Sequence, residues 1–204
     1  THGGLRVAAV NPRAQAAGIV PDLPLADARA LVPNLEVSAA EPTADMHALT
    51  ALAEGCGSYT PWTAPEAIGT GAEGAGVWLD ATGCSHLFGG EEALLESLVA
   101  RVEALGFAAR AAIADTPGAA WAVVRFGGGG TAQVVAPDGA PAALAELPVA
   151  ALRLAVAVAE GLAGLGLRRV GDLIGIPRAP LVARFGESLA KRLDQALGHI
   201  GEPI

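Results

Sequence analysis

The sequence predicts an α+β fold in which helices pack over a small sheet, followed by a region built only from helices. Between residues 77 and 136, apolar runs of strand length alternate with two longer helical segments, in the order strand–helix–strand–helix–strand. Beyond residue 148, short helical segments are separated by glycine turns. Alanine supplies much of the 52% hydrophobic content and aromatic residues only 4%. We therefore expect closely packed helices and a covered sheet.

The N-terminal third predicts short elements joined by tight turns. Gly18 closes one helical turn, and Pro33 ends a helix because the residue before a proline disfavours the helical conformation. In order, we expect a strand at 5–10, a helical turn at 11–17, a helix at 25–32, a short strand at 35–38 and a helix at 42–54. This stretch is a small helical insertion between strands.

The middle of the chain carries the strand and helix alternation. The clearest helix covers 91–105, with acids in its first turn, where the helix dipole favours them, and Gly106 at its end. Pro117 suits the first turn of a second helix, capped by Asp115 or Thr116. That helix ends at four glycines, 127–130, and strands are expected at 77–81, 107–114 and 131–136, all in one sheet.

The charge of the chain is unevenly distributed. The formal net charge is −8, yet residues 150–204 carry seven Lys/Arg and five Asp/Glu, a net of +2. If the chain contacts a phosphate backbone, this C-terminal quarter is the better candidate. An ordinary solvated face explains the same charges.

The composition argues against several kinds of site. Cys56 and Cys84 have no ligand-like spacing, so we expect neither a disulfide framework nor a zinc site, and we expect no cofactor. We find no signal peptide and no apolar run of membrane-spanning length, and we expect a cytoplasmic protein that contacts no membrane. The single methionine, Met46, suggests a piece of a longer chain.

Two glycine turns in the C-terminal region resemble a helix-hairpin-helix unit. Residues 165–167 (LGL) are followed by 171–173 (GDL). Such hairpins present backbone N–H groups to a phosphate, but small helical hairpins also serve as plain packing modules. Both interpretations stay open on these residues alone.

Five segments, in order, carry a resemblance to a known family: GIVPDLPLADARALVPNLEV, SYTP, VWLDATGCSHLFGG, ARAAIADTPGAAWAV and GLGLRRVGDLIGIPRAPLVARFG. They resemble the Y-family, or lesion-bypass, DNA polymerases over nearly the whole chain. The resemblance implies a polymerase core with a ferredoxin-like palm sheet, small helical fingers and a helical thumb. The implied domains are palm at 1–13, fingers at 14–66, palm at 67–147 and a thumb with a degenerate helix-hairpin-helix at 148–204, with the little finger and C-terminal region lying outside the chain.

The resemblance places the family's metal-binding Asp-Glu pair on residues without side-chain ligands. The pair precedes the Leu-Asp-x-Thr-Gly stretch and falls on Ala75 and Gly76. Nucleotidyl transfer in this fold needs two metal ions clamped by carboxylates, which alanine and glycine do not provide. Asp80 remains, but its counterpart in the family is not a principal metal ligand, and we expect it to fix the end of the strand.

The residues that would contact a triphosphate are also replaced. By the resemblance, the arginine of the family's Tyr-x-Ala-Arg element falls on Gln15, and two lysines fall on Pro117 and Trp121. None of the three carries the charge of the residue it replaces. Loss of carboxylates, arginine and lysine together implies a polymerase fold without catalytic residues or bound metal.

The thumb segment is altered as well. The family's first Gly-Val-Gly-Pro turn falls on 155–158 (AVAV), so we expect a continuous helix there through Ala159. The second hairpin keeps its glycines and has basic neighbours, so weak, salt-dependent DNA binding is a hypothesis. The candidate DNA-binding residues are Gly166, Arg168, Arg169, Gly171 and Arg184.

Within the family, this combination most resembles the ImuB-type proteins of the bacterial mutasome. The resemblance implies a non-catalytic scaffold in SOS-induced mutagenic translesion synthesis, in the bacterial cytoplasm and at the nucleoid. Its implied partners are an error-prone replicative-type polymerase, a RecA-like accessory protein and the sliding clamp, bound through regions outside this chain.

Three alternatives compete with this interpretation. An active lesion-bypass polymerase could use displaced ligands such as Glu73 or Asp80. An unrelated α+β enzyme could use the glycines at 127–130 as a phosphate loop, but no Gly-Lys-Ser/Thr follows them. A simple DNA-binding hairpin module is disfavoured by the acidic remainder of the chain.

Overall fold

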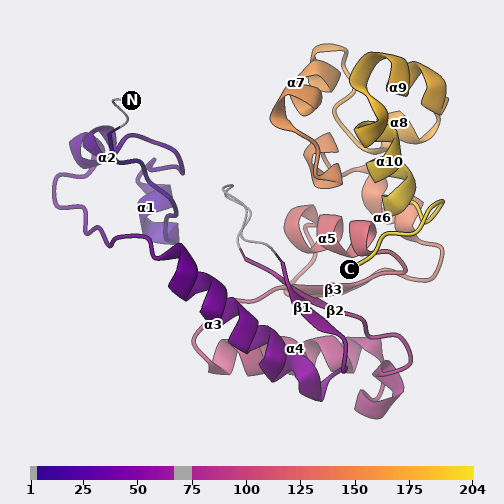
Figure 1. Ribbon diagram of the computed structural model, residues 1–204, viewed down its shortest axis with the longest axis horizontal. Helices are drawn as coiled ribbons and strands as arrows, with labels where there is room; N and C mark the ends of the chain where they lie inside the picture. Colours follow the sequence, from indigo (N-terminus) through magenta and orange to yellow (C-terminus); the bar gives the residue numbers. More distant parts are fainter. Residues whose placement is uncertain (1–3, 67–74) are drawn as a thin grey trace. The chain divides into compact units, whose positions relative to one another are not determined.

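The computed structural model describes residues 4–66 and 75–204 and contains two compact units, Thr1–Asp80 and Ala81–Ile204. Both helices and strands are present, which confirms the α+β class (Figure 1). The two units are described separately below.

The first unit combines three helices with a two-stranded hairpin. Helices α1 (Pro12–Ala16) and α2 (Leu25–Leu31) are short, and α3 (Pro42–Gly55) is longer and is followed by the 3₁₀ turn η1 (Cys56–Ser58). Strands β1 (Thr63–Pro65) and β2 (Val77–Leu79) pair antiparallel, with Ala64 opposite Trp78. Helix α3 packs against both strands and buries Leu49 and Ala53. The hairpin therefore has one face covered by α3.

The second unit begins with helices packed on a parallel strand pair. The 3₁₀ turn η2 (Ser85–Phe88) leads into α4 (Glu91–Ala104), and β3 (Ala111–Ile113) is joined to β4 (Ala132–Val134) through α5 (Pro117–Phe126). The two strands are parallel, with Ala112 opposite Gln133. Two parallel strands need a crossover connection, which α5 provides here. Helices α4 and α5 both pack against the strand pair.

The rest of the second unit is helical, as the glycine spacing predicts. It contains α6 (Ala140–Ala145), the 3₁₀ turn η3 (Val149–Leu152), α7 (Val156–Gly164), α8 (Gly171–Ile174), α9 (Arg178–Phe185) and α10 (Glu187–Ala196). Helix α7 begins at Val156 and runs through Ala159, whereas residues 153–155 are not helical, so the continuous helix expected across 155–159 is present only from Val156. Large apolar side chains from these elements are fully buried in one core: Leu144, Leu152, Leu162, Leu173, Leu189 and Leu193.

Two predicted strands are wrong, and so is the single sheet. Residues 5–10 form only an isolated bridge, Arg6 with Pro24, and residues 35–38 are in no strand. Apolar runs this short become strands only where a neighbouring segment supplies backbone partners, and for 5–7 that neighbour is an irregular turn at 22–25. Within the described residues, the strands form two separate two-stranded sheets.

Helices α5 and α10 approach each other unusually closely. Thr116 caps α5, because its Oγ1 accepts from Ala119 N at 3.1 Å, and the same hydroxyl donates to the Ala196 carbonyl at 3.0 Å. Gly118 is buried at the contact, where a Cβ atom would lie 2.9 Å from Ala196 Cα. The chain therefore needs glycine at 118 for packing rather than for backbone freedom.

None of the helices in the part of the chain described here is long and apolar enough to span a bilayer.

The α5–α10 contact gives a stability prediction. Gly118→Ala should destabilise the second unit by about 1–3 kcal/mol, because the added methyl group meets backbone atoms of α10 that have little room to move. Gly164→Ala in α7 is the matched control, since a Cβ there meets no atom within 4 Å and alanine favours a helix. Urea unfolding measures both. Equal stability of the two variants would contradict the close contact.

Candidate functional site

The β1–β2 hairpin carries the positions where the resemblance places the metal ligands. Ala75 is exposed and Gly76 half-buried, directly before β2, and the Gly76 carbonyl accepts from Glu66 N at 2.8 Å. Neither side chain offers an oxygen or nitrogen to a cation. Glu73, the displaced ligand of the alternative hypothesis, lies outside the described residues.

Asp80 lies at the end of β2, where its backbone is firmly held. Its N–H donates to the Trp62 carbonyl at 3.0 Å, and its carbonyl accepts from Thr60 Oγ1 at 2.5 Å. Thr60 is buried and also accepts from Trp62 N at 3.2 Å. These bonds close the open end of the hairpin, as expected of a residue that fixes the strand's end. The Asp80 side chain itself is on the surface.

Neither Gln15 nor Pro117 has a positively charged side chain that could bind a phosphate. Gln15 is exposed on α1, whose N-cap Asn11 accepts from Ala14 N at 2.8 Å. Pro117 is the first residue of α5 and has no backbone N–H to donate.

Trp121 is part of the protein interior. Its side chain is 3% exposed, and the guanidinium carbons of Arg125 and Arg153 lie 4.5 and 5.6 Å from its ring centroid. The Phe126 ring lies 5.9 Å away. Cations at these distances are attracted to an indole face. The position that the resemblance assigns to a lysine is therefore filled by an aromatic platform for two arginines.

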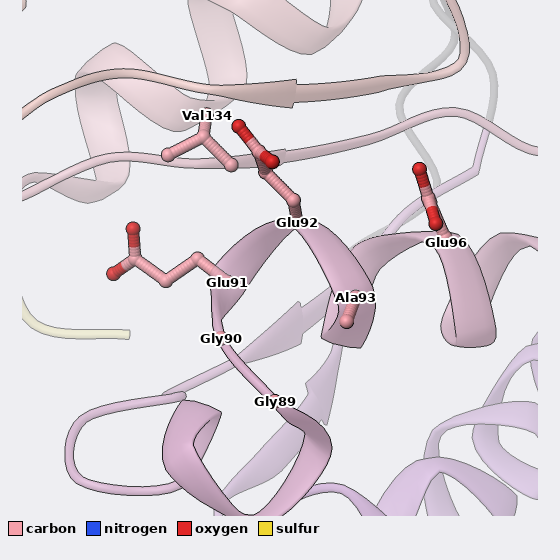
Figure 2. Close-up of a pocket in the computed structure, with 7 residues that line it drawn as sticks. All are labelled: Gly89, Gly90, Glu91, Glu92, Ala93, Glu96 and Val134. Atoms are coloured by element: carbon pink, nitrogen blue, oxygen red, sulfur yellow. The ribbon is translucent and has the colours of Figure 1, made fainter.

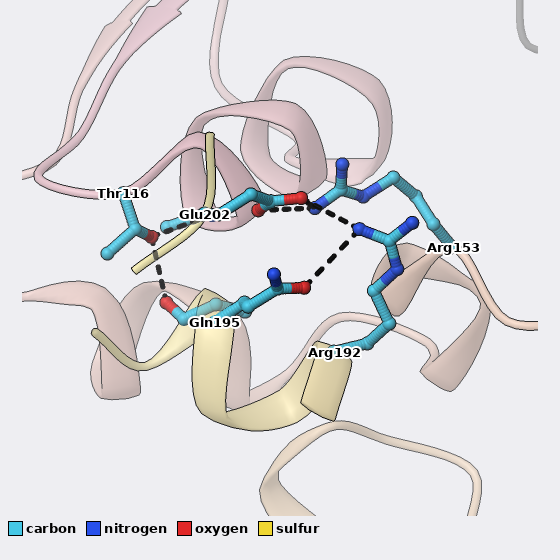
Figure 3. A network of polar contacts seen from close by, with 7 residues as sticks. Thr116, Arg153, Arg192, Gln195 and Glu202 are labelled. Atoms are coloured by element: carbon cyan, nitrogen blue, oxygen red, sulfur yellow. Dashed lines mark hydrogen bonds and ion pairs between the residues drawn. The ribbon is translucent and has the colours of Figure 1, made fainter. Parts of the chain in front are cut away.

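Arg153, which lies over this ring, also belongs to a polar network with Arg192, Gln195 and Glu202, and Figure 3 shows these four side chains. Glu202 Oε1 lies 2.7 Å from Arg153 Nη2 and 2.7 Å from Arg192 Nη1, and its side chain is 7% exposed. Arg192 also contacts Gln195 Oε1 at 3.4 Å. The sequence analysis missed Arg153 and Glu202, because their pairing spans 49 residues and no local pattern signals it.

Asp194 anchors a second polar cluster beside that network. Its carboxylate accepts from Arg178 Nε at 2.8 Å and contacts His199 Nδ1 at 3.2 Å. Burial would raise the pKa of Asp194, but its hydrogen bonds with Arg178 and His199 outweigh burial and hold that pKa below its ordinary value. Arg178 and Arg192 are thus engaged within the protein.

The turn before α8 satisfies its own backbone donors. The N–H groups of Arg168 and Arg169 both donate to Asp172 Oδ2, at 2.9 Å each. The Arg169 guanidinium pairs with Glu146. Hydrogen bonds from Arg169 and Arg168 lower the pKa of the Asp172 carboxyl. A phosphate at this turn would have to compete with a carboxylate already in place.

The two glycines of this turn have different structural reasons. Gly166 has φ +83°, a conformation that favours glycine, and it ends the turn after α7. A Cβ on Gly171 would lie 2.8 Å from the Ala145 carbonyl oxygen, so glycine allows α8 to pack on the end of α6. Backbone conformation accounts for Gly166 and packing accounts for Gly171, so neither glycine needs a bound phosphate to explain it.

Three of the basic side chains on the helical region are exposed and have no carboxylate partner among the described contacts. Arg168 is exposed at the turn before α8, and Lys191 is exposed on α10. Arg184 is also exposed, and its guanidinium carbon lies 5.9 Å from the Phe185 ring centroid. These three cations are the ones most available to a phosphate backbone.

A surface pocket lies at the start of α4 (Figure 2). Figure 2 shows Glu91, Glu92 and Glu96 on the first turns of that helix, beside Gly89, Gly90, Ala93 and Val134. Three carboxylates disfavour a phosphate-bearing ligand. Over residues 4–66 and 75–204, no three or more His, Cys, Asp or Glu side chains are grouped so as to hold a metal ion.

Comparison with known sequences gives a family and two relatives. A model of the impB/mucB/samB family matches residues 2–125. Protein ImuB of Caulobacter vibrioides strain NA1000 / CB15N is 47% identical over 188 residues, which are 92% of this chain and 39% of that protein. Protein ImuB of strain ATCC 19089 / CIP 103742 / CB 15 gives the same values. The chain therefore spans about 39% of the length of these curated relatives.

Comparison with solved structures concerns the fold. DinB from Sulfolobus solfataricus superposes with a TM-score of 0.74 at 15% identity, over 98% of this chain and 62% of DinB. An insertion ternary complex of Dbh DNA polymerase gives a TM-score of 0.75 at 16% identity, over 95% of this chain and 56% of Dbh. The polymerase-like core expected from the sequence is confirmed.

The self-capped turn before α8 gives a pH prediction. The folded pKa of Asp172 is lowered, so its stabilising effect is complete above the unfolded pKa and is lost as the pH falls through the folded value. Asp172→Ala should lower Tm at neutral pH, and the difference from wild type should shrink below about pH 4. Glu160→Gln, an exposed change on α7, is the control and should change Tm only slightly. A constant deficit for Asp172→Ala down to pH 2 would contradict the assignment.

Proposed function

The chain belongs to the impB/mucB/samB family, and on this basis we propose that it is a non-catalytic, polymerase-like scaffold in the mutagenic bypass of DNA damage. In this proposal the chain supplies shape and contact surfaces, and nucleotide incorporation is left to a partner. Residues 1–13 and 67–147 are assigned to the palm, 14–66 to the fingers and 148–204 to the thumb.

One observation carries the proposal: the β1–β2 hairpin has Ala75 and Gly76 where the metal-binding carboxylates are expected. A two-metal mechanism needs ligands that hold the cations about 3.5–4 Å apart. Losing an adjacent pair of carboxylates removes the main source of that clamp. Asp80 supplies a single carboxylate, which is a poor substitute for the adjacent pair.

The residues at the expected triphosphate positions support the same conclusion. Gln15 is neutral, Pro117 begins a helix, and Trp121 is a buried ring with two guanidiniums over it. A triphosphate contact at this position would need an accessible cation, whereas Trp121 is a neutral, buried ring.

The proposed partners come from the 47% identity to Protein ImuB and from the sequence resemblance. They are an error-prone replicative-type polymerase, a RecA-like accessory protein and the sliding clamp, in the bacterial cytoplasm at the nucleoid. Contacts with them are assigned to parts of the full-length protein beyond the region described here.

We further propose weak DNA contact through the helical region. Arg168 and Arg184 are exposed, as is Lys191 on α10, whereas the Arg169 guanidinium is paired with Glu146 and the turn amides with Asp172. Contacts made by a few exposed cations depend strongly on salt. This geometry suits transient contact with a phosphate backbone.

Primer extension by the full-length protein tests the proposal. We expect no incorporation with Mg²⁺ or Mn²⁺, from protein that still binds primer–template, since the carboxylate pair is missing. A known lesion-bypass polymerase serves as the positive control. Incorporation above background that is lost in Glu73→Gln or Asp80→Asn would overturn the proposal and establish the alternative, an active polymerase with displaced ligands.

Charge reversal tests the proposed DNA contact. Arg168→Glu combined with Arg169→Glu should abolish the DNA affinity of this chain at low salt, measured by fluorescence anisotropy. Arg168→Glu alone should reduce the salt slope by about one, as expected for one lost phosphate contact. Arg101→Glu on α4 is the control for net charge. Unchanged binding by the double variant would exclude the turn before α8 from the DNA contact.

A further inference from the structure

The last eight residues, 197–204, which we call the C-terminal segment, are held at two points. The first is the end of α10, where His199 N and Ile200 N donate to the Asp194 carbonyl at 2.8 and 3.4 Å. Gly198, at φ +79°, makes the turn that allows this. These bonds fix the start of the segment and leave its second half to other contacts.

The second point is Glu202, which lies between two guanidiniums from different elements. Arg153 follows η3 and Arg192 belongs to α10, and each places one Nη atom 2.7 Å from the Glu202 carboxylate. With 93% of its side chain covered, Glu202 is well shielded from water and salt. Removing one of these three charged side chains leaves the others without a partner where water solvates them poorly.

Arg153 reaches Glu202 only through an uncommon backbone conformation. Its φ of 56° and ψ of 41° are left-handed, a backbone conformation that is unfavourable for a residue with a Cβ. Its Nε is buried without a hydrogen-bond partner. A residue keeps such a conformation when its surroundings over-determine it. Here those surroundings are the Trp121 face on one side and the Glu202 carboxylate on the other.

We propose that Glu202 is a latch that fastens the C-terminal segment across α5, η3 and α10, and that Trp121 is the platform on which the latch is built. In this proposal Trp121, at the position where the resemblance expects a lysine, orients Arg153 toward Glu202. The inference rests on the packing of the second unit and stands whether or not the proposed function is correct.

The latch has a mechanical consequence for the second unit. Glu202 ties α10 to η3, while Thr116 and Gly118 bring α10 against α5. The exposed Lys191 is on α10, whose position relative to α5 is set by Thr116 and Gly118, while the latch sets the position of the C-terminal segment on α10. When the latch opens, residues 201–204 lose their attachment to η3 and α10, and the two arginines lose their shared carboxylate.

Backbone order parameters from ¹⁵N NMR relaxation test the latch. In the wild-type chain the amides of Gly201, Glu202 and Ile204 should be ordered, with S² near 0.85, and in Glu202→Gln they should fall below about 0.6. Amides of α5 and α10 should keep their values, because the segment opens while the unit stays folded. Glu160→Gln is the matched control, with the same charge change on exposed α7.

Three results would overturn the latch. Low order in the wild-type segment would mean that nothing fastens it. Unchanged order in Glu202→Gln would mean that the turn at Asp194 holds the segment alone. Loss of order throughout α5 and α10 would make Glu202 a general stabilising residue.

The platform is tested separately with Trp121→Leu, which keeps the site apolar but removes the ring that faces Arg153. Order at Gly201 and Glu202 should fall as in Glu202→Gln, while the α10 amides keep their values. A segment that stays ordered in Trp121→Leu would remove Trp121 from the account and leave a latch made of ion pairs alone. Because it keeps both arginines and Glu202, this variant separates the aromatic contribution from the charges.

Discussion

The close approach of α5 and α10 is the constraint on which the second unit depends. Gly118 lets the two backbones meet, and the Thr116 hydroxyl links the start of α5 to a carbonyl at the end of α10. One turn along α5, Trp121 is then enclosed, and the arginines that lie over it are brought toward the C-terminal segment. A side chain at 118 would separate the helices and disturb each of these contacts.

Much of the fold could be predicted from the sequence because its signals are local. Acids in the first turn and a terminal glycine locate α4, and a proline after a capping threonine locates α5. The strands before Asn11 and around Leu35 were wrongly predicted, because a strand depends on a partner that the local pattern does not reveal. Strand pairing is likewise invisible in the local pattern, which is why the sequence predicts one sheet where the described residues form two.

The candidate site divides in a similar way. Ala75, Gly76 and Trp121 could be found because a motif fixes their positions relative to Asp80 and Pro117. The partners of the basic residues could not, since Arg169 pairs with Glu146 and Arg153 with Glu202 across long stretches of sequence. The number of Lys and Arg residues in 150–204 therefore exceeds the number of positive charges that are free to contact DNA. Four of the seven bases in the helical region are paired with carboxylates once these pairs, Arg178 and Arg192 are known.

The central claim is that this polymerase-like core lacks a two-metal clamp, and Mn²⁺ binding tests it most directly. The full-length protein, with primer–template and a non-hydrolysable nucleotide, would be titrated with Mn²⁺ while electron paramagnetic resonance follows the free ion. The account predicts no uptake beyond that of the DNA and nucleotide alone. Two additional Mn²⁺ ions bound per protein would contradict it.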